Sequence, residues 1–189
     1  MNPNFYIRKG IHITSGFLFI WITRYDDMAT YFLGFWAVSA LFLDILRNYD
    51  NRWNKIFSSI FENYLKPSEK SGGLTGASTL WGGLYLVYLL FPRDIFYPVA
   101  MVMVISDALA AIIGQKIPVH TFSNGKTIGG SAMFLISAVL IFRYANIPLI
   151  LAIPVAIIVS GLEFSWKGSL ENLAIAFGCS LSLSMLTIL

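Results

Sequence analysis

One acidic residue, Asp107, lies inside the apolar stretch "MVMVISDALAAIIG" (residues 101–114). A carboxylate within a long apolar helix costs roughly a few kcal/mol unless it is paired with a base, bound to a metal or reached by water. Asp107, Ala111 and Gly114 fall on one helix face, where small residues let a ligand or a loop approach closely. Asp107 is therefore the strongest metal-ligand candidate, with an ion pair to a basic residue of another helix as the structural alternative.

The segment after this stretch, "QKIPVHTFSNGKTIGGS" (residues 115–131), is similar in composition to a phosphate loop. A Walker A loop is excluded because its first glycine position holds His120 and an apolar helix, in place of a strand, precedes it. The anion-binding features remain, since two glycines open the next helix and helix N-terminal amides favour negative charge. We expect phosphate binding here, with an ordinary flexible loop as the alternative. The candidates are Lys126, Thr127, Gly129, Gly130 and Ser131.

Other polar residues lie near the ends of apolar stretches. They are Arg8, Lys9 and His12 in "IRKGIH", Asp44 and Arg47 in "DILR", and Glu163, Glu171 and Asn172 around the last polar loop. Arg8 and His12 are four residues apart and share a helix face. Asp44 and Arg47 are one turn apart, and either a local ion pair or a role in a site fits that spacing. Together with Asp107 and the glycine-rich loop, these residues are typical of a magnesium–nucleotide site, in which few carboxylates and the phosphates hold the cation.

The elements that carry these residues are apolar helices. Of the 189 residues, 57% are hydrophobic and 12% are charged, whereas soluble domains have about a quarter charged. A bilayer core requires about 20 apolar helical residues. The sequence thus predicts an all-α integral membrane protein, a single domain over residues 1–189, with about seven transmembrane helices. Their expected ranges are 8–23, 28–46, 75–91, 95–113, 129–143, 146–162 and 172–188.

Residues 47–76 are the one long polar interruption. Trp53, Ile56, Phe57 and Ile60 recur there at helical spacing, followed by Pro67 and two glycines, which predicts an amphipathic helix along the membrane interface and then a loop. With seven spans, ten of the thirteen basic residues, Lys167 among them, fall on the same side of the predicted membrane as the N-terminus. The positive-inside rule then predicts that the N-terminus and the groups of candidate site residues lie on the cytoplasmic face. The single Cys179 allows no disulfide within the chain.

The same motifs carry a resemblance to a known family. In order, "RKGIH", "DILR", "KPSEKSGGLTGAS", "SDALAAIIGQKIP", "GKTIGGS" and "GLEFSWKGSLENLAI" are similar to the CTP-dependent lipid kinases, which include dolichol and polyprenol kinases, phytol kinases and CTP-dependent diacylglycerol kinases. The resemblance spans about residues 7–176. The chain departs from the family pattern in its last motif, which has Glu-Asn-Leu-Ala-Ile-Ala in place of Asp-Asn-Leu-Thr-Ile-Pro.

The resemblance implies a CTP- and Mg²⁺-dependent transfer of the γ-phosphate to a lipid alcohol at the cytoplasmic membrane face. Asp107, with Glu163, would hold the metal. Asp44, Glu69 and Glu163 are the candidates for the proton acceptor, and Glu69 is a candidate only through the resemblance. Residues 114–131 would hold the CTP phosphates. The implied nucleotide-binding residues are Gly114, Lys116, Gly125, Lys126, Thr127, Gly129, Gly130 and Ser131, with Arg47, Arg8, His12 and Asn172 in support.

Two other functions remain open at this stage. A phosphatidate cytidylyltransferase also uses CTP and magnesium, but it joins CMP to a lipid phosphate and releases pyrophosphate. A small transporter with Asp107 on an ion path predicts polar residues through the full depth of the bundle, and the outer halves of the apolar stretches offer little besides Ser, Thr and Tyr. The expected partners are CTP, a lipid alcohol and the membrane, with no nucleic acid. Polyprenol, diacylglycerol and phytol all remain open as the alcohol, and the sequence assigns no oligomeric state.

Overall fold

The computed structural model describes residues 3–70, 72–166, 168 and 170–187, and these residues are almost entirely helical. One isolated antiparallel bridge, Thr121–Thr127, is the only β-type pairing within the described ranges. The helices are α1 (Pro3–Ile22), α2 (Asp26–Tyr49), α3 (Asn51–Phe61), η1 (Glu62–Tyr64), α4 (Pro67–Lys70), α5 (Gly76–Leu90), α6 (Arg93–Met101), η2 (Val102–Ser106), α7 (Asp107–Lys116), α8 (Ile128–Tyr144), α9 (Leu149–Ser165) and α10 (Glu171–Thr187).

Each predicted apolar stretch forms a helix. The seven ranges correspond to α1, α2, α5, the continuous helix Arg93–Lys116, α8, α9 and α10. Two of these helical segments, Met28–Tyr49 and Arg93–Lys116, are long and apolar enough to cross a bilayer. The all-helical prediction is confirmed, and the count of seven spans stays a prediction. Residue 188, at the end of the last predicted span, and Lys167 lie outside the described residues.

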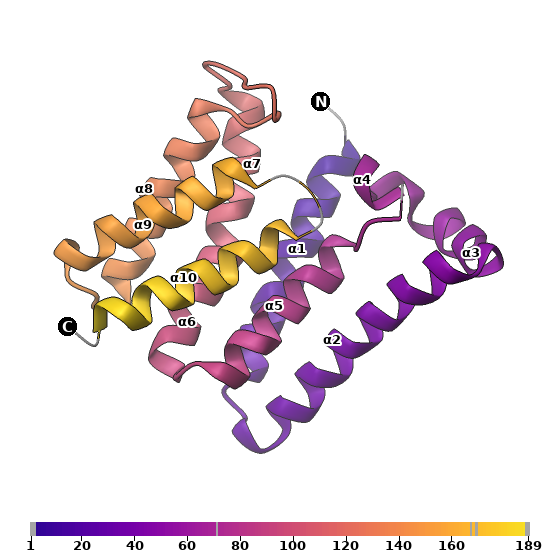
Figure 1. The fold of residues 1–189 in the computed structure, drawn as a ribbon, viewed down its shortest axis with the longest axis horizontal. Helices are drawn as coiled ribbons and strands as arrows, with labels where there is room; N and C mark the ends of the chain where they lie inside the picture. Colours follow the sequence, from indigo (N-terminus) through magenta and orange to yellow (C-terminus); the bar gives the residue numbers. More distant parts are fainter. Residues whose placement is uncertain (1–2, 71, 167, 169, 188–189) are drawn as a thin grey trace.

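The helices form a layer with the Arg93–Lys116 helix behind it. α2, α5, α10, α9 and α8 follow one another side by side, and α1 crosses behind α5 (Figure 1). α7 packs mainly against α8. The buried core includes Phe96, Phe134, Phe142 and Leu84. This arrangement brings the start of α1, the end of α7, the start of α8, the end of α9 and the start of α10 to one end of the molecule.

The Arg93–Lys116 helix changes its winding just before Asp107. Val102–Ser106 is a π-helical turn, and Asp107 follows it directly. Such turns are rare and are frequent at functional sites, because the altered hydrogen-bond pattern redirects side chains and frees backbone groups. Here the carbonyl oxygen of Met103 accepts a hydrogen bond from His12 Nε2 of α1 at 3.1 Å. The π-turn therefore attaches α1 to the segment that carries Asp107.

The predicted amphipathic helix is α3. None of its residues is buried, and Trp53, Ile56 and Ile60 expose their apolar side chains. Asp50 caps its N-terminus by accepting a hydrogen bond from the backbone N–H of Arg52 at 2.8 Å, which satisfies one of the free amides of the first turn. The helix is confirmed, and its position along a membrane interface belongs to the proposals below.

Candidate functional site

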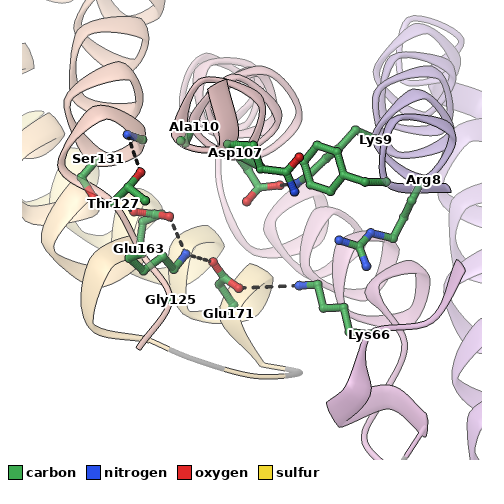
Figure 2. Close-up of a pocket in the computed structure, with 16 residues that line it drawn as sticks. Arg8, Lys9, Lys66, Asp107, Ala110, Gly125, Thr127, Ser131, Glu163 and Glu171 are labelled. Carbon is green, nitrogen blue, oxygen red and sulfur yellow. Dashed lines mark hydrogen bonds and ion pairs between the residues drawn. The ribbon is translucent and has the colours of Figure 1, made fainter. Parts of the chain in front are cut away.

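A polar cavity of about 300 Å³ opens where the helix ends converge (Figure 2). Residues from α1, the segment before α4, α7, the α7–α8 loop, α8, α9 and α10 line it. Four cationic and three anionic side chains face this space. The lining residues are Phe5, Arg8, Lys9, Lys66, Asp107, Ala110, Ala111, Gly114, Gln115, Gly125, Lys126, Thr127, Gly130, Ser131, Glu163 and Glu171.

Asp107 forms an ion pair with α1. Its Oδ2 atom accepts a hydrogen bond from Lys9 Nζ at 2.6 Å and lies 3.6 Å from His12 Nε2. Lys9 and His12 are three residues apart, so both reach the same side of α1. The structural alternative considered for Asp107, a basic partner from another helix, is thus present, and the pair lies on the wall of the cavity.

The glycines of α7 and α8 allow the two helices to approach closely at the cavity floor. A Cβ atom on Gly114 would lie 2.7 Å from Thr127 Oγ1, and one on Gly130 would lie 2.9 Å from the carbonyl oxygen of Ala110. Either distance is too short for a side chain without a shift of the helices. Thr127 is the N-cap of α8 and accepts a hydrogen bond from the backbone N–H of Gly130 at 3.0 Å. The close approach therefore fixes the N-terminal end of α8 against the cavity.

Lys126 joins the loop to the last two helices. Its Nζ atom donates hydrogen bonds to Oε1 of Glu163 in α9 and to Oε1 of Glu171 in α10 (Figure 2). Glu163 Oε2 also accepts a hydrogen bond from the Ser131 hydroxyl at 3.5 Å. Burial alone would lower the pKa of Lys126, but the charges of Glu171 and Glu163 outweigh it and raise that pKa. Lys126 therefore stays positively charged at neutral pH.

Glu171 also contacts a second lysine. Its Oε2 atom lies 3.8 Å from Lys66 Nζ, so its two oxygens face two different cations. Lys66 belongs to the segment between η1 and α4. The chain thus brings together cations from residues 8, 9, 66 and 126 around three carboxylates (Figure 2).

A second polar network, at the end of α2, lies outside the cavity. Arg47 donates to Asp44 Oδ1 at 2.8 Å, to the carbonyl oxygen of Glu69 at 2.9 Å and to that of Gly73. Asp44 Oδ2 accepts hydrogen bonds from the backbone N–H and hydroxyl of Thr75 and from the hydroxyl of Ser78, at 2.5–3.0 Å. These charges are buried and held by the protein itself, which is how buried ions are normally accommodated.

Glu69 belongs to this network as well. Its Oε2 atom accepts a hydrogen bond from the backbone N–H of Lys66 at 2.8 Å, and its Oε1 atom accepts one from the backbone N–H of Gly76 at 3.0 Å. Glu69 therefore ties Lys66, just before α4, to Gly76, the first residue of α5.

The predicted site residues separate into two groups. The cavity wall contains Arg8, Asp107, Gly114, Gly125, Lys126, Thr127, Gly130, Ser131 and Glu163. His12 reaches the same site through Asp107. The structure does not bring Asp44, Arg47, Glu69, Lys116, Gly129 and Asn172 to the cavity wall. Asn172 instead donates hydrogen bonds to Thr79 Oγ1 at 3.0 Å and to the Gly76 carbonyl at 3.4 Å.

Sequence reasoning named Lys9 and Glu171 among the polar residues of the cluster but gave neither a role, and it did not consider Lys66 as a site residue. For Lys9 a signal was available, because an intramembrane carboxylate needs a cation and Lys9 shares a helix face with His12 at i,i+3. Lys66 and Glu171 are 105 positions apart. A single sequence does not reveal contacts between residues so far apart, so only the fold shows that they meet.

The donor set suits a magnesium ion that arrives with phosphates. Within the described ranges, no group of three His, Cys, Asp or Glu side chains is placed to hold a metal ion by itself. Mg²⁺ in nucleotide sites is commonly held by one or two carboxylates, with phosphate and water oxygens completing its octahedron. Asp107 and Glu163, on the wall of one cavity, provide that number of carboxylates.

Comparisons with known proteins leave the activity open. No protein-family profile matches the chain, and no solved structure matches it. The chain is similar to an uncharacterized protein of Rickettsia prowazekii (strain Madrid E), with 35% identity over 103 residues that cover 53% of this chain and 50% of that protein. The chain thus spans about half the length of the curated relative that it matches.

Proposed function

We propose that this chain is a CTP- and Mg²⁺-dependent kinase that transfers the γ-phosphate of CTP to a lipid alcohol at the cytoplasmic membrane face. The resemblance of its motifs to the CTP-dependent lipid kinases supports the choice of CTP and of a lipid acceptor. The observation that carries the proposal is the cavity in which Lys9–Asp107 and Lys126–Glu163 meet beside the N-terminal end of α8.

The membrane arrangement that we propose has seven spanning helices with the cavity on the cytoplasmic side. Many large apolar side chains are exposed on the helix surfaces, including Met28 at 74%, Tyr31 at 81% and Phe35 at 65% on α2. Soluble proteins rarely expose contiguous apolar surface of this extent. The exposed apolar residues of α3 would lie in the interface next to the site, where a lipid hydroxyl and a water-soluble nucleotide can meet.

Phosphoryl transfer requires positioning and charge neutralisation more than covalent chemistry. Asp107 would hold the metal, and Mg²⁺ when bound would neutralise charge on the transferring phosphoryl group. Arg8, Lys9 and Lys126 are close enough to the cavity to neutralise the remaining phosphate charge. The dipole of α8, whose first turn carries Gly130 and Ser131 on the cavity wall, would favour an anion at this helix N-terminus.

The proton of the lipid hydroxyl requires an acceptor in the cavity. Asp44 and Glu69 are occupied by hydrogen bonds from the chain and do not line the cavity. Glu163 fits this role better, because it lines the cavity and the hydrogen bond that its Oε2 atom accepts from Ser131 is long, at 3.5 Å. Burial raises the pKa of the Glu163 carboxyl despite the nearby charge of Lys126, and a raised pKa makes a carboxylate a better proton acceptor. We therefore assign Glu163 as the general base.

The test uses purified protein in detergent with γ-labelled CTP, Mg²⁺ and a panel of polyprenol, diacylglycerol and phytol, followed by thin-layer separation. We expect label in one lipid, which names the acceptor. Pyrophosphate release with phosphatidate as the substrate, and no labelled lipid, would show a cytidylyltransferase. No CTP consumption with any lipid, together with solute flux in proteoliposomes, would show a transporter.

A further inference from the structure

The Lys66–Glu171–Lys126 bridge has features that an ordinary surface ion pair lacks. Glu171 opens α10 and places one carboxylate oxygen on each lysine. Glu171 and Lys126 are largely shielded from solvent, with side chains 12% and 20% exposed. All three residues line the cavity next to Ser131 and Gly130. One internal anion thus lies between two cations from distant parts of the chain (Figure 2).

Both lysines are held by their backbones. The N–H of Lys66 donates to Glu69, which the Arg47–Asp44 network anchors through the carbonyl of the same residue. The N–H of Lys126 donates to Asn124 Oδ1 at 3.0 Å, and Asn124 Nδ2 donates to the carbonyl of Phe164 at 2.7 Å. A loop built only for flexibility does not require either set of contacts. The fold therefore fixes the backbone positions from which the two lysine side chains reach Glu171.

A carboxylate and a terminal phosphoryl group both present paired oxygens with delocalised negative charge. Two ammonium groups that hold a carboxylate between them can therefore hold two oxygens of a phosphate chain in the same way. The carboxylate must then leave, because two anions cannot share the same pair of cations without repulsion.

We propose that Lys66 and Lys126 form a polyphosphate clamp and that Glu171 is its internal counter-ion, displaced when a nucleotide's phosphates bind. This assigns Lys66 as a binding residue and Glu171 as a residue that lowers the affinity for polyphosphate. The inference rests on the proposed function for the identity of the nucleotide, but the clamp itself is testable without nucleotide, metal or lipid.

The test measures binding of inorganic tripolyphosphate to the full chain in detergent by titration calorimetry, without Mg²⁺. Glu171→Gln removes the competing charge and keeps the size of the side chain. We expect it to bind tripolyphosphate about tenfold more tightly than the wild type, the ratio for loss of about one charge-assisted hydrogen bond to the competitor. Lys66→Met should weaken binding by a similar factor. Its side chain is 38% exposed, so the variant is expected to fold.

The matched control is Glu62→Gln, which removes an exposed glutamate paired with Lys70 at 3.4 Å. It should leave tripolyphosphate binding unchanged. Unchanged or weaker binding by a folded Glu171→Gln variant would overturn the counter-ion role, and unchanged binding by Lys66→Met would overturn the clamp. Since no lipid or CTP is present, failure of the clamp is distinct from failure of the kinase assay. Absence of tripolyphosphate binding to the wild type would overturn the clamp even where labelled lipid forms.

Discussion

At the residue scale, each of the three carboxylates on the cavity wall faces a cation from another part of the chain. Asp107 faces Lys9, Glu163 faces Lys126, and Glu171 faces two lysines. Partly buried charges are tolerated when they are paired and hydrogen-bonded. A ligand with both phosphates and a divalent cation offers each of these groups a new partner of opposite sign, so the same pairs that stabilise the fold can bind a metal–nucleotide complex.

Asp107→Asn tests the central carboxylate. The amide keeps the shape but loses the charge that pairs with Lys9 and, under the proposed function, with the metal. We expect CTP-dependent lipid phosphorylation to fall by about 100-fold or more, the scale typical of the loss of one electrostatic catalytic group. The measurement is the initial rate of label transfer from γ-labelled CTP. Asp94→Asn, on the exposed start of α6, is the control and should retain the wild-type rate.

At the element scale, two structural features position the residues that line the cavity. The first is the close crossing of α7 and α8, where the glycines set the distance between the helices. The second is the buried Asp44–Arg47 network, which holds the segment from Lys66 to Gly76 against the end of α2. Asp44 and Arg47 are thus placed to act on the site through Glu69 and Lys66, and we interpret them as positioning residues.

Gly129→Ala tests the helix crossing. A Cβ atom at Gly129 would overlap the backbone carbonyl oxygen of Ile117, which cannot rotate away as a side chain can. We expect a loss of about 1–3 kcal/mol of stability, the usual range for an overpacked contact, seen as a lower thermal unfolding midpoint in detergent. Gly161→Ala, in α9, is the matched control because nothing lies within 4 Å of its added Cβ. Equal midpoints for the two variants would contradict the close-packing argument.

Arg47→Met tests the anchoring network. The substitution leaves the Asp44 carboxylate buried, with 1% of the residue exposed, and without its cation. Removing one partner of a buried ion pair costs about 3–5 kcal/mol, so the unfolding midpoint should fall strongly. Lys70→Met, which breaks an exposed pair with Glu62, should cost no more than about 1 kcal/mol. A small effect of Arg47→Met would show that the network does not hold the segment.

At the scale of the whole molecule, the polar groups gather at one end and the apolar side chains cover the helix surfaces. The Arg93–Lys116 helix is the better buried of the two long apolar helices, and Met28–Tyr49 lies at the edge of the layer with most of its surface exposed. A bilayer around this surface would cover the exposed aromatic and aliphatic side chains, and in the orientation that we propose the cavity would lie at its cytoplasmic boundary.

Single-cysteine labelling tests this orientation. Cys179 is buried, and its replacement by alanine provides a background for Ser123→Cys in the α7–α8 loop and Tyr144→Cys at the end of α8, both at exposed positions. In sealed right-side-out vesicles, a membrane-impermeant maleimide should label position 144 and not position 123. Permeabilisation should then expose position 123. Labelling of position 123 from outside would contradict the cytoplasmic site.

Local sequence pattern was enough to predict the helices and to select residues that could take part in chemistry. Apolar runs separated by short polar breaks depend on local pattern, so all seven predicted ranges correspond to helices, and α3 was recognisable from its periodicity. Asp107 and Lys126 were identifiable because a buried carboxylate and a lysine beside helix-opening glycines are unusual in any context.

Which of these residues meet in space depends on the tertiary fold. Asp44 and Arg47 from their spacing, and Glu69 from the resemblance, were candidate site residues, but the fold places them in a closed network away from the cavity wall. Lys66 and Glu171 become site residues because α10 returns to the segment that precedes α4. Pairing of buried charges depends on the distance between them in space. The local sequence pattern of two segments a hundred residues apart does not specify that distance.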